Sequence, residues 1–122
     1  MIKLKYLFIL SFITLFSICA EAQISKPTKN IPASEYYTGG QDSMYAFLQR
    51  HVKYPQMAKR NRIQGECIIK FVIGADGVAK DYQVVKNVGG GLGEEAARVV
   101  SLLKFKSPGY KFQTSIPIIF KL

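Results

Sequence analysis

Residues 66–73 form an alternating run in which every second residue, from Cys67 to Ile73, is apolar and the residues between them include Glu66 and Lys70; this is the clearest pattern in the chain. A period of two is typical of a half-buried β-strand. Directly after this run, Ala75-Asp76-Gly77 has the composition of a hairpin turn, in which Gly77 supplies the positive φ that such turns need. We therefore expect a strand that turns back into a second strand. Its faces carry Cys67, Ile69, Phe71 and Ile73 on one side and Glu66, Ile68, Lys70 and Val72 on the other.

The second strand of the hairpin, over about residues 78–86, has a less regular pattern. Tyr82 and Val84 share one face, but Ala79 is out of phase with them. A single extra residue in a strand shifts the alternation in this way, so the pattern predicts a β-bulge near Lys80-Asp81.

A last strand is expected over about residues 113–122. Pro117 lies inside it and cannot donate a hydrogen bond to a neighbouring strand. Prolines within sheets are largely confined to edge strands, so we expect this strand at an edge of the sheet. Its apolar face would comprise Thr114, Ile116, Ile118, Phe120 and Leu122.

Two stretches have the spacing of amphipathic helices. The first ends at Pro55, because the residue before a proline is pushed away from the α region, and a short basic helical turn follows over residues 56–62. The second is expected over about residues 94–105, after the glycine-rich loop 89–93. The predicted fold is α+β, of order α-β-β-α-β, with a three-stranded antiparallel sheet and two helices packed on one face. The helical stripes are Met44, Phe47, Leu48 and Val52, and Leu92, Ala96, Val99 and Leu103.

The chain begins with the pattern of a secretory signal, which we assign to residues 1–22. A basic start precedes an apolar stretch, and Ala20-Glu21-Ala22 has the small residues of a cleavage site. An uncleaved membrane anchor is the alternative, although the apolar stretch is about 22 Å long as a helix against a hydrocarbon core of roughly 30 Å. A lipoprotein signal at Cys19 is a third interpretation, but Ile18 stands where such signals have a small residue.

The rest of the chain divides into a leader and one domain. Residues 23–35 are polar, contain prolines and lack periodicity, so we expect a flexible leader. Residues 36–122 are expected to form a single domain, because a chain of 122 residues that is 48% hydrophobic can bury one modest core.

The chain is basic, with a formal net charge of +9 that becomes +8 when Lys3, Lys5 and Glu21 leave with the signal. A basic protein outside the cytoplasm has no evident nucleic-acid partner. Its positive field favours acidic protein segments, anionic lipid head groups or cell-wall polymers. A solvated surface that confers solubility explains the charge equally well.

The polar residues do not have the arrangement of a catalytic or metal site. The loop 89–93 lacks the glycine spacing of a dinucleotide-binding turn, and Asp76 and Asp81 lack the further oxygen ligands of a calcium loop. The single histidine, His51, lies on a helix, whereas Cys67 lies on an apolar strand face. A cysteine-dependent activity at Cys67 is the enzymatic alternative, but we expect no enzymatic activity, no cofactor and no metal.

An ordered set of short motifs runs through residues 36–122: Tyr54-Pro55, Ala58, Ile63-Gln64-Gly65, Phe71, Asp76-Gly77, Gly91-Leu92, Glu94-Glu95-Ala96, Pro108-Gly109 and Pro117-Ile118-Ile119-Phe120. None of these motifs is specific by itself. In this order and at these spacings, they resemble the C-terminal domain of TonB-family energy transducers.

The resemblance implies a non-enzymatic periplasmic module that captures an extended segment of an outer-membrane transporter on its last strand. In this family an inner-membrane proton-driven complex pulls on the domain to open the transporter. The docking edge would be formed by Ile116, Pro117, Ile118, Ile119 and Phe120, with Arg60 and Arg62 contacting the transporter.

Family members usually also carry a membrane anchor and a long proline-rich spacer, and we expect neither in this short chain. Energy transduction needs such a mechanical link between the membranes. The alternative interpretation is therefore a stand-alone structural or regulatory binding domain, or a homodimer formed through sheet edges, with no role in energy transduction.

Overall fold

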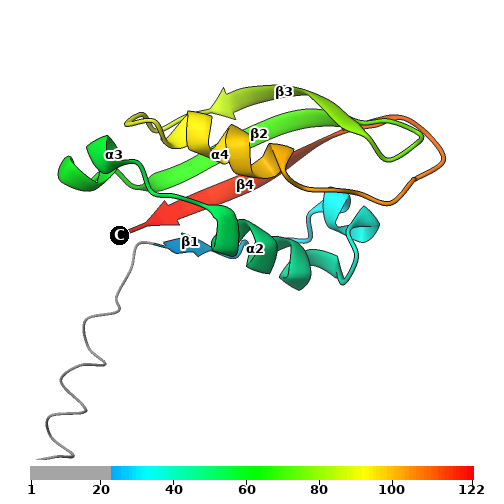
Figure 1. The fold of residues 1–122 in the computed structure, drawn as a ribbon, viewed down its shortest axis with the longest axis horizontal. Coiled ribbons are helices and arrows are strands. Elements are labelled where there is room, and N and C mark those ends of the chain that lie inside the picture. The colour runs from blue at the N-terminus through cyan, green and yellow to red at the C-terminus, as the bar shows by residue number, and fades with distance from the viewer. Residues whose placement is uncertain (1–22) are drawn as a thin grey trace, which may run out of the picture.

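A computed structural model describes residues 23–122 of the chain, and the secretory signal predicted for residues 1–22 lies outside this range. The described residues form an α+β domain in which helices cover a sheet (Figure 1), so the predicted fold class is confirmed. Within residues 23–122, no helix is long and apolar enough to cross a membrane. The elements in chain order are β1 (Gln23–Ser25), the 3₁₀-helix η1 (Pro32–Tyr36), α2 (Gly40–His51), α3 (Gln56–Arg60), β2 (Gly65–Ile73), β3 (Ala79–Lys86), α4 (Leu92–Ser101) and β4 (Phe112–Lys121).

The sheet has four strands in the order β1-β4-β2-β3, and all neighbouring pairs are antiparallel. The expected count of three strands was therefore too low by one. β2 pairs with β4 along its whole length, from Gly65 opposite Phe120 to Ile73 opposite Phe112. This long central pair forms the middle of the sheet.

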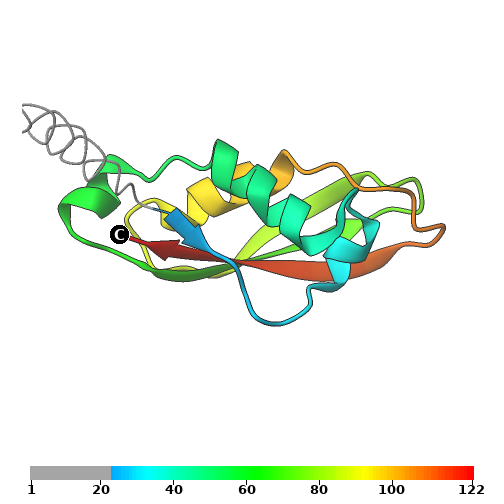
Figure 2. The ribbon, with the colours of Figure 1, turned by 90° about the horizontal axis from the view of Figure 1, so that it is seen from below.

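Helices α2 and α4 lie on one face of the sheet, and α3 lies at its end (Figures 1 and 2). The alternation predicted for β2 is confirmed, because its core-facing side chains are fully buried. α4 begins at Leu92 and ends at Ser101, so it is shorter and earlier than expected. The side chains with no exposed surface include Met44, Leu48, Cys67, Ile69, Phe71, Ile73, Leu92, Ala96, Val99, Val100, Ile116 and Ile118.

The bulge predicted near Lys80-Asp81 is confirmed in β3. The register shifts between Lys70 and Val72 of β2, so that β3 contributes an extra residue there. Asp81 takes a φ of +59°, the left-handed conformation that accommodates the extra residue. A second shift lies between Ile68 and Ile69.

The leader 23–35 was expected to be flexible, but it contains β1 and most of η1. The reason is long-range pairing of its backbone, which no local pattern indicates. The Ile24 N–H donates to Gln49 Oε1 at 2.9 Å, and the Ile31 N–H donates to Gln41 Oε1 at 2.8 Å. Both isoleucine side chains are buried in the core cluster, so two glutamines of α2 hold the leader against the domain.

Candidate functional site

β4 does not lie at the edge of the sheet, which corrects the expectation drawn from Pro117. β1 pairs over three residues with the side of β4 that faces away from β2, which we call the outer side of β4. Ser25 lies opposite Ile119 and Gln23 opposite Lys121. Among the strands of residues 23–122, none pairs with β4 beyond this short stretch on that side. Pro117 is tolerated because β1 stops before it, so no neighbouring strand on that side requires its missing N–H.

The direction of each backbone group in β4 follows from one hydrogen bond. The Tyr45 hydroxyl donates to the carbonyl oxygen of Pro117 at 2.8 Å, and Tyr45 belongs to α2 rather than to β2. The Pro117 carbonyl therefore points away from β2. Because backbone groups of alternate residues point to opposite sides of an antiparallel strand, Ser115 and Ile119 also direct their N–H and C=O outward, whereas Ile116 and Ile118 direct theirs to β2.

The five residues predicted to form the docking edge are therefore of two kinds. Ile116 and Ile118 are fully buried, Phe120 is 1% exposed, and all three belong to the core. Pro117 and Ile119 lie half-buried on the opposite face of the sheet. An added strand would pair with the outward backbone of Ile119, and its core-facing side chain would lie opposite Phe120, as Ile24 of β1 does.

The leader also covers part of this outer side. After β1, the chain dips below the sheet on the face opposite the helices and then rises into η1 (Figure 2). Between this loop and the sheet lies a cavity of about 310 Å³. It is lined by Pro27, Thr28, Lys29, Ile31, Glu66, Pro117 and Ile119.

The motif residues around α3 build the corner at the C-terminal end of β4. The Tyr54 ring packs edge-on against Phe120, with their centroids 5.6 Å apart, and its hydroxyl donates to the carbonyl of Ile63. Pro55 precedes the first residue of α3 with a φ of −59°, and Ala58 is fully buried. These residues hold the corner together.

Two further motif residues connect this corner to the sheet. Gln64 Oε1 accepts a hydrogen bond from the N–H of Leu122 at 3.2 Å, which holds the end of β4. Gly65 has a φ of +146°, and a Cβ there would lie 2.9 Å from Val88 Cγ1. These motif residues therefore have structural roles in the folding of this corner.

Arg60 and Arg62 are both exposed on this corner. Arg60 is the last residue of α3, and Arg62 takes a φ of +52° in the turn that follows. α3, β1 and the C-terminus lie at the same end of the molecule (Figure 1). The structure therefore brings both arginines to the end of the sheet where β1 pairs with β4.

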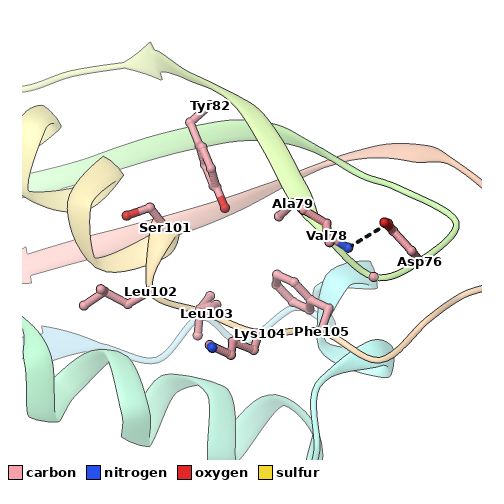
Figure 3. A pocket seen from close by; sticks show the side chains of 10 residues that line it. Asp76, Val78, Ala79, Tyr82, Ser101, Leu102, Leu103, Lys104 and Phe105 are labelled. Carbon is pink, nitrogen blue, oxygen red and sulfur yellow. Dashed lines mark hydrogen bonds between the residues drawn. The ribbon is translucent and has the colours of Figure 1, made fainter.

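Asp76 and Gly77 form the hairpin turn at the opposite end. Asp76 Oδ1 accepts a hydrogen bond from the N–H of Val78 at 3.1 Å (Figure 3). Gly77 has a φ of +89°, and a Cβ there would lie 2.7 Å from the carbonyl oxygen of Phe105. Both residues therefore serve the turn and its packing against the segment after α4.

A cavity of about 490 Å³ lies between this turn, the start of β3 and the end of α4 (Figure 3). Most of its lining is apolar, including Val78, Leu102 and Phe105, and the Asp76 carboxylate is engaged in the turn. Across residues 23–122, no three histidine, cysteine, aspartate or glutamate side chains gather where they could hold a metal ion.

β3 forms the other edge of the sheet. Val78, just before it, and Val84 and Val85 within it are exposed by 59%, 40% and 52%. However, its two register shifts and its exposed lysines, Lys80 and Lys86, are features that discourage a further strand from pairing. The outer side of β4 is therefore the better candidate for strand addition.

Tyr45 and Gln49 were not identified from the sequence, although both act at the β4 edge. Their spacing of four places them on one side of α2, and Leu48 lies on the same side. Tyr45 is 1% exposed, and burial raises the pKa of its hydroxyl, with a smaller contribution from Glu66. The spacing of four residues was the sequence feature that could have identified them. Neither side chain is purely apolar, so neither was included in the apolar stripe predicted for this helix.

Cys67 is a buried core residue in β2, with no exposed surface. Burial is the largest influence on its thiol and raises the pKa, while a hydrogen bond with the backbone of Val88 acts in the opposite direction. A thiol whose pKa is raised is mainly protonated at neutral pH and is a poor nucleophile.

The comparisons with known proteins agree with this architecture. Two solution structures of the TonB C-terminal domain of Helicobacter pylori are similar to the chain. The longer fragment has a TM-score of 0.56 and 28% identity over 79% of this chain and 96% of that one. The shorter has a TM-score of 0.51 and 32% identity over 61% of this chain and 84% of that one.

No curated protein sequence gives a significant match. The family description "Gram-negative bacterial TonB protein C-terminal" matches residues 50–122, which are more than half of the chain. This range includes the α3 corner, the hairpin, α4 and β4. The chain therefore belongs to the family of TonB C-terminal domains.

Proposed function

We propose that this domain binds an extended segment of an outer-membrane transporter by strand addition at the outer side of β4. The observation that carries the proposal is the pairing of β1 with Ile119–Lys121, in which an extended segment already lies along this side. The proposal does not require catalysis, because strand addition uses backbone hydrogen bonds and surface contacts alone.

Family membership supports the proposal at a coarser level. TonB C-terminal domains are non-enzymatic, are associated with transport and belong to the periplasm and cell envelope. An extended partner segment would be consistent with that role. To this role the proposal adds the kind of segment that binds, which is a transporter segment, and the place where it binds, which is the outer side of β4.

The recognition would depend mainly on the backbone. Ile119 directs a donor and an acceptor outward, and Pro117 contributes only its carbonyl, which Tyr45 already engages. An added strand would therefore pair most strongly near Ile119. Because backbone groups are common to all residues, we expect side-chain changes at Ile119 to alter the affinity less than removal of its N–H.

The proposal is tested with peptides from the periplasmic N-terminal segments of transporters encoded in the same genome. Each peptide is titrated into isotope-labelled protein while amide chemical shifts are followed. We expect the largest shifts at Ile119 and Lys121. Ile119→Pro, which removes the outward donor, should abolish binding, whereas the matched variant Ile119→Thr, which keeps the donor, should bind within about threefold of wild type, equivalent to less than about 1 kcal/mol.

Two results would reject strand addition at β4. One is wild-type affinity in a folded Ile119→Pro protein. The other is a set of peptide-induced shifts that is confined to β3 or to the cavity beside the hairpin.

Arg60 and Arg62 would add an electrostatic contribution to the same binding event. Both arginines are exposed at the end of the sheet where the partner strand would enter. We expect Arg60→Gln with Arg62→Gln to weaken binding of acidic segments and to reduce the dependence of the affinity on salt. An unchanged salt dependence would assign these arginines to the solvated surface.

A homodimer through β3 is the competing function, and the exposed Val84 and Val85 are the observation that favours it. Val84→Lys should then lower the dimer fraction measured by sedimentation. A protein that sediments as a monomer at all concentrations would leave strand capture at β4 as the remaining function.

A further inference from the structure

We infer that β1 is a displaceable occupant of the docking side of β4, so that the chain competes with its own partner for the same backbone groups. The inference rests on the proposed function and adds two statements to it. Partner binding requires β1 to leave, and the partner strand has to supply an apolar side chain in the place of Ile24.

The competition follows from the register. Ser25 lies opposite Ile119 and Gln23 lies opposite Lys121, and these are the outward-facing positions of β4. The Ile24 N–H points the other way, because it donates to Gln49 Oε1. Gln23 and Ser25 therefore direct their backbone groups to β4, and an incoming strand cannot reach Ile119 while Ser25 pairs with it.

The pairing is short enough to be reversible. β1 has three residues, and its outer side is held by the side chain of Gln49 and not by a further strand. Beside it, the ion pair between Lys26 and Asp42 spans 3.4 Å with side chains that are 61% and 90% exposed. Exposed ion pairs of this kind contribute little to stability.

The leader has a second anchor that does not depend on β1. The Ile31 N–H donates to Gln41 Oε1 at 2.8 Å, and Gln41 Nε2 donates to the carbonyl of Lys29 at 2.9 Å. Between the two anchors, Thr28, Lys29 and Asn30 are exposed. β1 can therefore leave β4 while Ile31 and η1 stay in place.

β1 also shows what a partner strand would need. Ile24 is 9% exposed and belongs to the core cluster. Next to it, a cavity of about 410 Å³ is lined by Ile24, Ser25, Lys26, Tyr45, Ala46 and Gln49. The occupant is therefore an extended segment with an aliphatic side chain at this position, whose own N–H would be received by Gln49. A charged side chain there would be buried without a partner, which is unfavourable.

The first experiment weakens the pairing of β1 with β4 in the full chain. Ser25→Pro removes the N–H that β1 directs to Ile119 but leaves β4 unchanged. Its control, Thr28→Pro, places a proline in the exposed part of the leader. When the competent state is only partly populated, the apparent dissociation constant rises by the reciprocal of its fraction. We expect transporter peptides to bind Ser25→Pro at least about tenfold more tightly than wild type, which corresponds to about 1.4 kcal/mol, and Thr28→Pro within about twofold.

A second variant, Gln49→Ala, weakens β1 without a change in either strand. We expect faster hydrogen exchange at the Ile119 amide and a smaller gain in affinity than in Ser25→Pro, because Gln49 would also receive the N–H of the partner strand. Retained protection of the Ile119 amide in Ser25→Pro would overturn the inference. Equal peptide affinity in wild type and in Ser25→Pro would also overturn it, even if strand capture itself is correct.

The last experiment is independent of transporters. A synthetic peptide with the sequence of residues 21–29 is added to Ser25→Pro protein, where it should shift the Ile119 and Lys121 amides; the same peptide with Ile24→Asp should not. If this peptide binds and no transporter peptide does, β1 is a displaceable occupant and the proposed partner is wrong. If neither leader peptide causes shifts, or both bind equally, the role assigned to Ile24 is wrong.

Discussion

The hydroxyl of Tyr45 donates a hydrogen bond to the carbonyl oxygen of Pro117 at 2.8 Å. This contact joins α2 to β4 at the residue where β4 has no N–H of its own. It provides a hydrogen-bond donor for a carbonyl to which neither β1 nor β2 donates. It also shows which residues of β4 direct their backbone groups outward. The same side of α2 carries Gln49, which holds Ile24. α2 therefore organises the side of the sheet on which we place partner binding.

Tyr45→Phe tests how much this hydrogen bond contributes to the free energy of unfolding. The variant keeps the ring but leaves the partly buried carbonyl without its donor, so we expect the free energy of unfolding to fall by about 1–2 kcal/mol in denaturant titrations. The control is Tyr110→Phe, because the Tyr110 hydroxyl is exposed and shares a hydrogen bond with the Tyr36 hydroxyl at the surface. An equal loss in both variants would show that the Pro117 carbonyl has no special dependence on Tyr45.

Stability should decline at alkaline pH. Burial raises the pKa of Cys67 above its ordinary value of 9.0 and that of Tyr45 above 10.0. The unfolded chain then binds fewer protons than the folded one above these values, so stability is fully present below them and is lost as pH rises. Tyr45→Phe should make the decline above pH 10 shallower. A wild-type stability that rises above pH 9 would contradict this sign.

Cys67 should be protected from thiol reagents in the folded protein. It has no exposed surface, and its raised pKa keeps it protonated at neutral pH. We expect labelling only at the rate of unfolding, and immediate labelling in denaturant. Cys67→Ala should lower the free energy of unfolding by roughly 1 kcal/mol. Rapid labelling of native protein would contradict the assigned burial.

Gly77 and Gly109 form a matched pair, since both have positive φ, +89° and +83°. An added Cβ would lie 2.7 Å from the Phe105 carbonyl oxygen at Gly77, but would meet nothing within 4 Å at Gly109. Gly109→Ala should cost about 1 kcal/mol for the left-handed conformation alone. Gly77→Ala should cost at least about 1 kcal/mol more, because backbone must shift as well. Thermal unfolding of the two variants measures the difference.

Ile118→Pro and Ile119→Pro should differ in folding. Ile118 directs its N–H to β2 and is fully buried, so proline there removes a central hydrogen bond and part of the core. Ile119 directs its N–H to β1 and is half-buried. We expect circular dichroism to show a folded Ile119→Pro protein and a largely unfolded Ile118→Pro protein. The reverse result would invert the orientation that we assign to β4.

Much of the fold was predictable because it depends on local patterns. The alternation in β2 needs only residues 66–73, and the Asp76-Gly77 turn needs only a carboxylate and a residue with free φ. The bulge near Asp81 was visible as a break in phase. The order of the motifs from Tyr54 to Phe120 indicated the TonB C-terminal family, which residues 50–122 match.

The position of β4 and the role of β1 were decided by tertiary structure. Gln23–Ser25 is too short to show a strand period, and it pairs with residues at the other end of the chain. Pro117 indicated an edge, but a proline requires only that no strand needs its N–H on that side, and β1 ends before reaching it. The amide of Gln49 and the hydroxyl of Tyr45 gain their roles only when α2 lies beside β4. Sequence therefore determined which segments form strands and helices, whereas long-range backbone pairing determined which edge of the sheet is occupied.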